Sequence, residues 1–255
     1  MGSISSKVID DSSKPMAHCI INSFVFRPNE NIDISVPISY TTHEDPAPYI
    51  KCSYFGSDKY IVFAHGNAST IYDMRPFLIR LSNLTRTNVI AFEYPGYSCC
   101  EGNPSEKGCY DNIRKMIEHL VLFDEIDSKN IYLVGQSLGT GIVVNFASEC
   151  NWDNPIMLIS PYKSIISIVL DSNSCESRNN IDMFESIDRI DNIRCPIKII
   201  HGTKDDVINI SHGQELYQRS KNKMEPVWVE CGHNDILERI TLEHWNDFLQ
   251  RQQDL

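Results

Sequence analysis

The chain has 255 residues, of which 42% are hydrophobic and 22% charged, and its formal net charge at pH 7 is −11. This length and composition fit a soluble globular protein with a sizeable core, in one large α/β domain or two small ones. The negative charge argues against nucleic-acid partners and against docking of a basic surface on anionic lipid, because both need clustered Lys and Arg.

The N-terminal region lacks the features of a secreted or membrane-spanning protein. It has no apolar signal-peptide core, and no run in the chain approaches the roughly 18 to 20 apolar residues that span a bilayer. The nine cysteines are scattered without disulfide or zinc spacing, which favours reduced thiols and a cytoplasmic, non-secreted protein. Met1-Gly2 followed by Ser6 fits the N-myristoylation pattern. We therefore predict a flexible segment over residues 1–20, with weak peripheral membrane association through a myristoyl group on Gly2.

Strands and helices alternate along the rest of the chain, without repeats or linkers. Residues before about 55 are predicted to form antiparallel lead-in strands. The predicted strands after them are 60–64, 88–94, 131–134, 156–159, 197–200 and 227–230. One helix is expected to begin near Ser105, a second to follow the strand at 131–134, and a closing helix to carry Ile236, Ile240, Leu242, Trp245 and Leu249. The pattern predicts a single domain over 21–255, with a mostly parallel, doubly wound sheet.

The pattern is weaker over residues 161–193. Residues 162–170 are typical of an amphipathic helix, whereas 171–180 are polar and loop-like. Two interpretations remain open: a small lid over 161–193, or a plain connecting helix and loop.

The most informative motif is Gly135-Gln136-Ser137-Leu138-Gly139, which joins the strand at 131–134 to apolar residues at helical spacing. Strand, G-x-S-x-G and helix in this order are typical of a nucleophile elbow, in which the serine occupies a strained, tight turn. The glycines are expected to remove side chains that would collide around the serine. The alternative is a glycine-flanked serine in an ordinary loop, and the flanking strand and helix favour the elbow.

A serine nucleophile needs a base, usually a histidine that a buried carboxylate orients. In this architecture the expected chain order is serine, acid, histidine, with the later members just beyond carboxyl ends of strands. The strand at 197–200 is followed by Asp205 and Asp206, and the strand at 227–230 is followed by His233. His233 is therefore the predicted base and Asp205 the predicted acid, with Asp206 as an open alternative.

The oxyanion of an acyl-transfer intermediate needs two backbone N–H donors. The predicted donors are Leu138, which follows the serine, and Asn67, which follows the strand at 60–64. His65 is expected to be a structural group that hydrogen-bonds this loop.

Neither a metal nor a cofactor is predicted. Cys231, His233 and Asp235 could coordinate a metal, but a zinc site needs a further partner group, and no other Cys/His pair has a suitable spacing. Cys231 as a rival nucleophile lacks the elbow or helix N-terminus that would activate it.

Several motifs of the chain resemble those of a known family and occur in the same order along the sequence. They are Phe63-Ala64-His65-Gly66-Asn67-Ala68, Glu93-Tyr94-Pro95-Gly96-Tyr97-Ser98, the G-x-S-x-G motif, His201-Gly202-Thr203-Lys204-Asp205-Asp206-Val207-Ile208 with Ser211-His212-Gly213 continuing the aspartate loop, and Cys231-Gly232-His233-Asn234-Asp235-Ile236. Over roughly residues 50–250 the chain resembles the α/β-hydrolase superfamily, and more narrowly the Bem46-like serine hydrolases, whose animal members include protein depalmitoylases. The resemblance implies an α/β-hydrolase fold with Ser137 as nucleophile, Asp205 as acid and His233 as base, which selects Asp205 over Asp206.

The leading hypothesis is a serine hydrolase of carboxylic ester or thioester bonds that forms an acyl-enzyme on Ser137. Its expected substrate is a small acyl ester or an acylated protein or lipid. The depalmitoylase branch carries an N-terminal cysteine cluster, whereas this chain has no cysteine before Cys19, which argues against that substrate. The alternatives are a serine peptidase and a non-catalytic binding module on the same fold.

Overall fold

The computed structural model describes residues 25–170 and 182–250. The predicted flexible segment 1–20 with Gly2, and the polar stretch 171–180, lie outside the described residues. Myristoylation and a complete lid over 161–193 therefore stay predictions.

The described residues form an eight-stranded sheet with the strand order β1-β2-β4-β3-β5-β6-β7-β8. The strands are β1 (Ser39–Tyr40), β2 (Pro48–Cys52), β3 (Tyr60–Ala64), β4 (Asn88–Phe92), β5 (Ile131–Gln136), β6 (Ile156–Ile159), β7 (Ile197–Gly202) and β8 (Val227–Val229). β1 and β2 pair antiparallel, and β2 also runs antiparallel to β4. All pairs from β4 to β8 are parallel. The predicted strands and the antiparallel lead-in are thereby confirmed.

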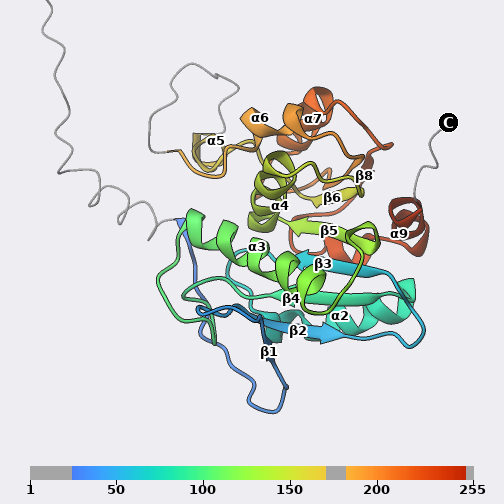
Figure 1. Cartoon of the computed structure of the whole chain (residues 1–255). Coiled ribbons are helices and arrows are strands. Elements are labelled where there is room, and N and C mark those ends of the chain that lie inside the picture. Colours follow the sequence, from blue (N-terminus) through green and yellow to red (C-terminus); the bar gives the residue numbers. More distant parts are fainter. Residues whose placement is uncertain (1–24, 171–181, 251–255) are drawn as a thin grey trace, which may run out of the picture.

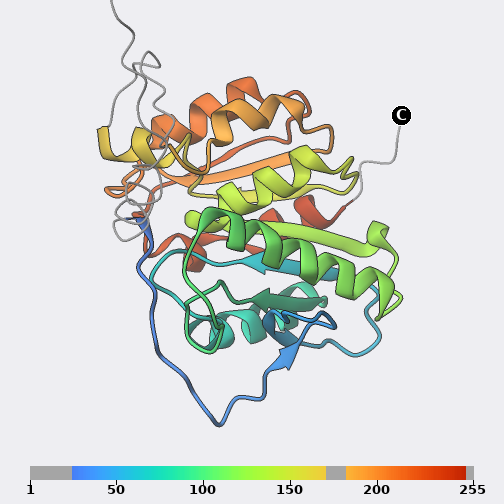
Figure 2. The same ribbon diagram turned by 60° about the vertical axis from the view of Figure 1, so that its left-hand side comes forward.

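Helices cover both faces of this sheet (Figures 1 and 2). The helices are α2 (Ile71–Thr85), α3 (Glu106–Leu122), α4 (Leu138–Glu149), α5 (Ile165–Leu170), α6 (Ser186–Arg189), α7 (Ile210–Arg219), α8 (Ile236–Arg239) and α9 (Leu242–Leu249). Short 3-10 turns span Ser128–Asn130 and Ile190–Asn192. Figure 2 shows α3 and α4 side by side across one face.

Neighbouring residues of each central strand enter two different halves of the core. Val62 and Leu133 pack with side chains of α3, α4 and α7, whereas Phe63 and Val134 pack with those of α2, α8 and α9. All four are at most 1% exposed. Strands that are buried on both faces are apolar throughout, which explains why their sequence shows runs rather than alternation. This packing holds the carboxyl ends of the parallel strands at one edge of the sheet.

The structure corrects the prediction at the C-terminus, where two helices replace the single closing helix. The chain is extended at Thr241, whose φ and ψ are −86° and 165°, and Thr241 forms a capping box with His244 at the start of α9. A capped start satisfies N–H groups that a continuous helix would use internally, so the helix that carries Ile236 ends before Ile240.

Helices α2 and α7 were not among the predicted elements, and neither was the four-residue α6. α2 contains Pro76, which normally indicates a helix boundary, but a capping box between Thr70 and Asp73 starts this helix and the proline is tolerated inside it. α7 begins at Ile210, so Ser211-His212-Gly213 lies in a helix rather than in a continued aspartate loop. No helix in the described residues has the length and apolar character needed to cross a bilayer.

Candidate active site

Ser137 lies on the tight turn between β5 and α4. Its φ of 49° and ψ of −119° place it in a region that non-glycine residues rarely adopt. Such a strained conformation persists only where the surroundings impose it, and it is found mostly at functional sites. The turn is fixed by two hydrogen bonds, from Ser137 N–H to the carbonyl of Ile159 (2.9 Å) and from the Thr140 hydroxyl to the carbonyl of Ser137 (2.7 Å).

Gly135 and Gly139 are required for a different reason from the expected one. A Cβ on Gly135 would lie 2.5 Å from the carbonyl oxygen of Gly139, and a Cβ on Gly139 would lie 2.0 Å from the carbonyl oxygen of Ala64. Both contacts are with backbone atoms. The glycines therefore let the first turn of α4 pack directly against β5 and the end of β3, rather than clearing space around the serine side chain.

The structure brings Ser137, His233 and Asp205 together from three separate loops. Nε2 of His233 lies 3.1 Å from the Ser137 hydroxyl, and Nδ1 of His233 lies 2.7 Å from a carboxylate oxygen of Asp205. The three residues follow β5, β8 and β7, so all of them lie at the carboxyl edge of the sheet. This is the geometry that a base needs when it takes a proton from a hydroxyl and is oriented by an acid.

Asp205 is the acidic member of this array, and Asp206 is exposed. The Asp205 side chain is fully buried, and one of its oxygens accepts the N–H groups of Val207 (3.0 Å) and Ile208 (2.7 Å). Burial by itself raises the pKa of this carboxyl, but the bonds from His201, His233 and Ile208 outweigh burial and hold the pKa well below its usual range. Asp205 is therefore ionised at neutral pH.

His201 contacts the same carboxylate, although no role was predicted for it. Its Nε2 donates to the carbonyl of Ile208 (2.9 Å) and lies 3.4 Å from Asp205 Oδ2. A Cβ on Gly213 would lie 2.5 Å from the His201 ring, so this glycine of α7 makes room for the imidazole. The signal that could have identified His201 is its position at the end of β7, four residues before Asp205.

The loop after β3 passes beside the serine. A Cβ on Gly66 would lie 3.5 Å from the Ser137 Cβ, and Asn67 and Leu138 line the same cavity as Ser137. Among the described residues, nothing accepts a hydrogen bond from the backbone N–H of Asn67 or of Leu138. The two expected donors thus border the same cavity as the serine, and neither N–H is bonded to another described residue.

His65 and Glu93 form a fully buried pair behind this loop. Nε2 of His65 donates to Glu93 Oε1 (2.9 Å), and Nδ1 donates to the carbonyl of Gly66 (2.9 Å). The other oxygen of Glu93 accepts the N–H of Ile71 (3.0 Å) and the hydroxyl of Ser98 (2.6 Å). His65 is therefore the structural, loop-bonding group that was predicted. Because the C=O and N–H of a trans peptide point in opposite directions, its bond to Gly66 turns the next N–H away from His65.

The cavity at Ser137 has a volume of about 350 Å³. Its apolar lining comes from Val25, Leu138, Tyr162, Ile165, Ile168, Val207 and Ile208, and its polar lining from Asn67, Ser137, His233 and Asn234. The polar groups gather at the serine, whereas α5 and the segment after Asp205 supply apolar walls. Such a cavity fits an apolar group whose reactive end lies at the serine.

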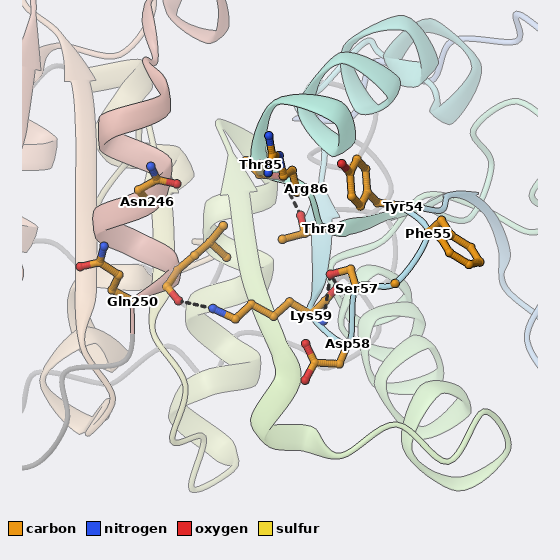
Figure 3. A pocket seen from close by; sticks show the side chains of 12 residues that line it. Tyr54, Phe55, Ser57, Asp58, Lys59, Thr85, Arg86, Thr87, Asn246 and Gln250 are labelled. Atoms are coloured by element: carbon orange, nitrogen blue, oxygen red, sulfur yellow. Dashed lines mark hydrogen bonds between the residues drawn. The ribbon is translucent and has the colours of Figure 1, made fainter.

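A second hollow, of about 400 Å³, lies at the opposite edge of the sheet (Figure 3). It is bordered by residues that precede β3 and β4, namely 54–59 and 85–87, and by the end of α9. Figure 3 shows Lys59 in its wall, where the ammonium group donates to the carbonyl of Leu249 (3.0 Å). None of the predicted site residues lines this hollow, so the site at Ser137 is the stronger candidate.

Within the described part of the chain, no group of three or more His, Cys, Asp and Glu side chains is arranged to hold a metal ion. Cys231 is buried, and burial together with the nearby Asp235 raises the pKa of its thiol. A protonated thiol is a poor nucleophile, so the structure supports Ser137 over Cys231 as the reactive group.

Comparisons with known proteins agree with this architecture. A sequence model described as the alpha/beta hydrolase fold matches residues 59–156. An α/β hydrolase of Acanthamoeba polyphaga mimivirus is 47% identical over 188 residues, which cover 72% of this chain and 70% of that protein. The human alpha/beta hydrolase domain-containing protein 17C is 36% identical over 211 residues, which cover 80% of this chain. The chain spans only 61–65% of the length of its vertebrate relatives.

Solved structures show the same fold at low sequence identity. The esterase Pf2001 of Pyrococcus furiosus has a TM-score of 0.69 at 20% identity, covering 88% of this chain and 95% of that chain. Est1E of Butyrivibrio proteoclasticus, solved with ferulic acid bound, has a TM-score of 0.64 at 15% identity, covering 83% and 97%. Together with the mimivirus relative, the sheet order and the matching sequence model, these similarities show that the chain belongs to the α/β-hydrolase superfamily.

Proposed function

We propose that the protein is a serine hydrolase of carboxylic ester or thioester bonds that works through an acyl-enzyme on Ser137. The observation that carries this proposal is the continuous hydrogen-bonded array from the Ser137 hydroxyl through His233 to the ionised Asp205. The array lies at the polar end of a cavity with apolar walls. A strained serine conformation supports catalysis over a binding role, because strain costs of order 1–3 kcal/mol and has no use in a passive scaffold.

In the acylation step, His233 Nε2 takes the hydroxyl proton as Ser137 Oγ attacks the acyl carbonyl carbon. Nδ1 of His233 donates to Asp205, which fixes the tautomer that leaves Nε2 free to accept. The ionised carboxylate stabilises the imidazolium that forms. Because the pKa of Asp205 is held well below its usual range, the proton stays on the imidazole rather than passing to the carboxylate.

The tetrahedral intermediate carries a negative oxygen, which the N–H groups of Asn67 and Leu138 stabilise. One such donor is worth about 10²–10³ in kcat when it is preorganised in a site that excludes water. Collapse of the intermediate transfers the proton from His233 to the leaving alcohol or thiol. Water then attacks the acyl-enzyme with the same histidine as base, which returns Ser137 and releases the carboxylic acid.

The apolar walls favour an acyl group as the part of the substrate that enters the cavity. We propose a small acyl ester, or an acylated protein or lipid, as the substrate class. No step of this mechanism requires a cofactor.

The test is a panel of p-nitrophenyl esters, acyl thioesters and peptide amides of graded chain length, measured with the wild type and with Ser137→Ala. The proposal expects turnover of esters or thioesters that falls at least about 10³-fold in Ser137→Ala. It is overturned if Ser137→Ala keeps wild-type turnover, and a preference for peptides would move the assignment to a serine peptidase.

A further inference from the structure

The first described residues, 25–31, begin at the active-site cavity, and we call them the strap. Figure 2 shows them in blue at the left edge of the molecule. Val25 lines the cavity at Ser137, and Phe26 is 2% exposed, with its ring against that of Phe184 at 6.0 Å between centroids. The strap is thus a wall of the site, although it precedes the first strand of the sheet.

The strap forms two hydrogen bonds with the side chain of Asn67. The amide nitrogen of Asn67 donates to the carbonyl of Val25 (2.7 Å), and the amide oxygen accepts the N–H of Arg27 (2.9 Å). One side chain thereby pairs with the C=O and N–H of alternate residues, as a neighbouring strand would. The same oxygen also accepts the hydroxyl of Tyr97 (2.7 Å) and the N–H of Ala68 (3.0 Å). The orientation of Asn67 is therefore fixed by four hydrogen bonds.

The strap also holds the residue after Asn67. The amide nitrogen of Asn29 donates to the carbonyl of Ala68 (3.2 Å), and the carbonyl of Asn29 accepts the N–H of Ser98 (2.8 Å). Ala68 has a φ of 58°, in the left-handed region that alanine avoids. Such a conformation costs about 1–2 kcal/mol, so neighbouring contacts must impose it. The strap supplies one of those contacts.

We propose that the strap positions the oxyanion donor, so that turnover depends on residues 25–31 as well as on the strand-end loops. This inference rests on the proposed function, in which the Asn67 N–H stabilises the oxyanion. His65 bonds the carbonyl of the Gly66–Asn67 peptide, and the strap bonds the side chain of Asn67 on the other side of that peptide. A donor must lie about 2.7–3.1 Å from the oxyanion to act, so a small displacement of this N–H is enough to weaken it. With the strap bonds removed, the His65 bond still fixes the Gly66 side of this peptide, but the Asn67 side is held less tightly, and we expect its N–H to occupy this position for less of the time.

The decisive variant is Arg27→Pro, which deletes the N–H that bonds Asn67 while Arg27→Ala keeps it. Arg27 is exposed and precedes Pro28, a context that favours the extended backbone that proline accepts. We expect Arg27→Pro to lower kcat about tenfold with little change in KM, because the donor acts mainly on the transition state. Arg27→Ala is expected to stay within about twofold of the wild type. Inhibition by an alkyl trifluoromethyl ketone, which forms a tetrahedral adduct on the serine, should weaken in parallel with kcat.

A second variant, Asn67→Asp, keeps the size of the side chain and places a carboxylate oxygen opposite the carbonyl of Val25. Asn67→Asp is expected to lower kcat by a similar factor. If Arg27→Pro does not fold, this second variant tests whether the strap positions the oxyanion donor. The inference is overturned if both folded variants turn over ester like the wild type and lose only thermal stability. Ser137→Ala is measured beside them. If Ser137→Ala stays active, the proposed function itself fails, whereas an inactive Ser137→Ala with fully active strap variants refutes the strap alone.

Discussion

Replacement of Glu93 by glutamine tests the buried pair behind the oxyanion loop. The Glu93 carboxylate accepts four hydrogen bonds, from His65 and the Tyr94 N–H at one oxygen and from the Ile71 N–H and the Ser98 hydroxyl at the other. Glutamine keeps one accepting oxygen and places an NH₂ group at the other position. Both positions face donors, so the substitution leaves buried N–H groups without an acceptor.

The loss of unfolding free energy depends on how many buried N–H groups lose their acceptor in each orientation of the glutamine amide. With the NH₂ toward Ser98, the hydroxyl can rotate and accept, which leaves the Ile71 N–H as the unsatisfied donor. With the NH₂ toward His65, the imidazole can give up its Nε2 proton and accept, because Nδ1 keeps its bond to Gly66, and the Tyr94 N–H is left as the unsatisfied donor. Either orientation leaves one unsatisfied buried donor, which together with the lost charge-assisted bonds costs about 3 kcal/mol. For a chain of this length, that loss lowers Tm by about 6–12 °C.

The assay is thermal unfolding followed by circular dichroism for the wild type, Glu93→Gln and a control, Glu101→Gln. Glu101 is exposed, so its replacement is expected to change the free energy of unfolding by less than about 0.5 kcal/mol. A Glu93→Gln protein that melts within about 2 °C of the wild type would refute the reasoning, because the hydrogen-bond count would then have no energetic consequence.

Three further variants test other parts of the account. Gly139→Ala places a Cβ 2.0 Å from the carbonyl oxygen of Ala64. We expect either no folded protein or a free energy of unfolding, measured in urea, that is lower by more than about 3 kcal/mol. A fully stable variant would contradict the close packing of α4. Asp205→Asn removes a carboxyl whose folded pKa is lowered, so the stabilisation from ionised Asp205 is complete above its unfolded pKa of about 3.9 and is lost as pH falls through the folded value. The difference in unfolding free energy between wild type and Asp205→Asn should therefore shrink below pH of about 4, and a difference that is constant with pH would refute this linkage. Ile168→Trp fills the apolar side of the cavity, and kcat/KM should fall about tenfold more for octanoyl than for acetyl esters; an equal fall would place the acyl group elsewhere.

The elbow and the order of the array are predictable from sequence because their signals are local. Gly135 and Gly139 bracket Ser137 between a buried strand and an apolar helix, and His233 directly follows a strand end. Each of these signals lies within a few residues, so no knowledge of distant contacts is needed. Parallel strands then bring their carboxyl ends to one edge, which is enough to predict that Ser137 and His233 meet an aspartate there, while the choice of Asp205 over Asp206 came from the family resemblance.

The parts that escaped prediction depend on contacts between distant segments. Residues 25–31 have no regular periodicity, and their role becomes visible only when the Asn67 side chain bonds them across about forty residues of sequence. His201 reaches Asp205 through the turn after β7, which periodicity does not describe. The sequence analysis did not predict α2, in which tertiary packing outweighs the local preference of Pro76 against a helix interior.

The central claim, an acyl-enzyme on Ser137, is tested most directly by covalent labelling with an alkyl fluorophosphonate followed by peptide mapping. We expect a single adduct on Ser137, whose formation is slowed by an excess of acyl ester and abolished in Ser137→Ala. No adduct on the active wild type, or an adduct that persists in Ser137→Ala, would contradict it.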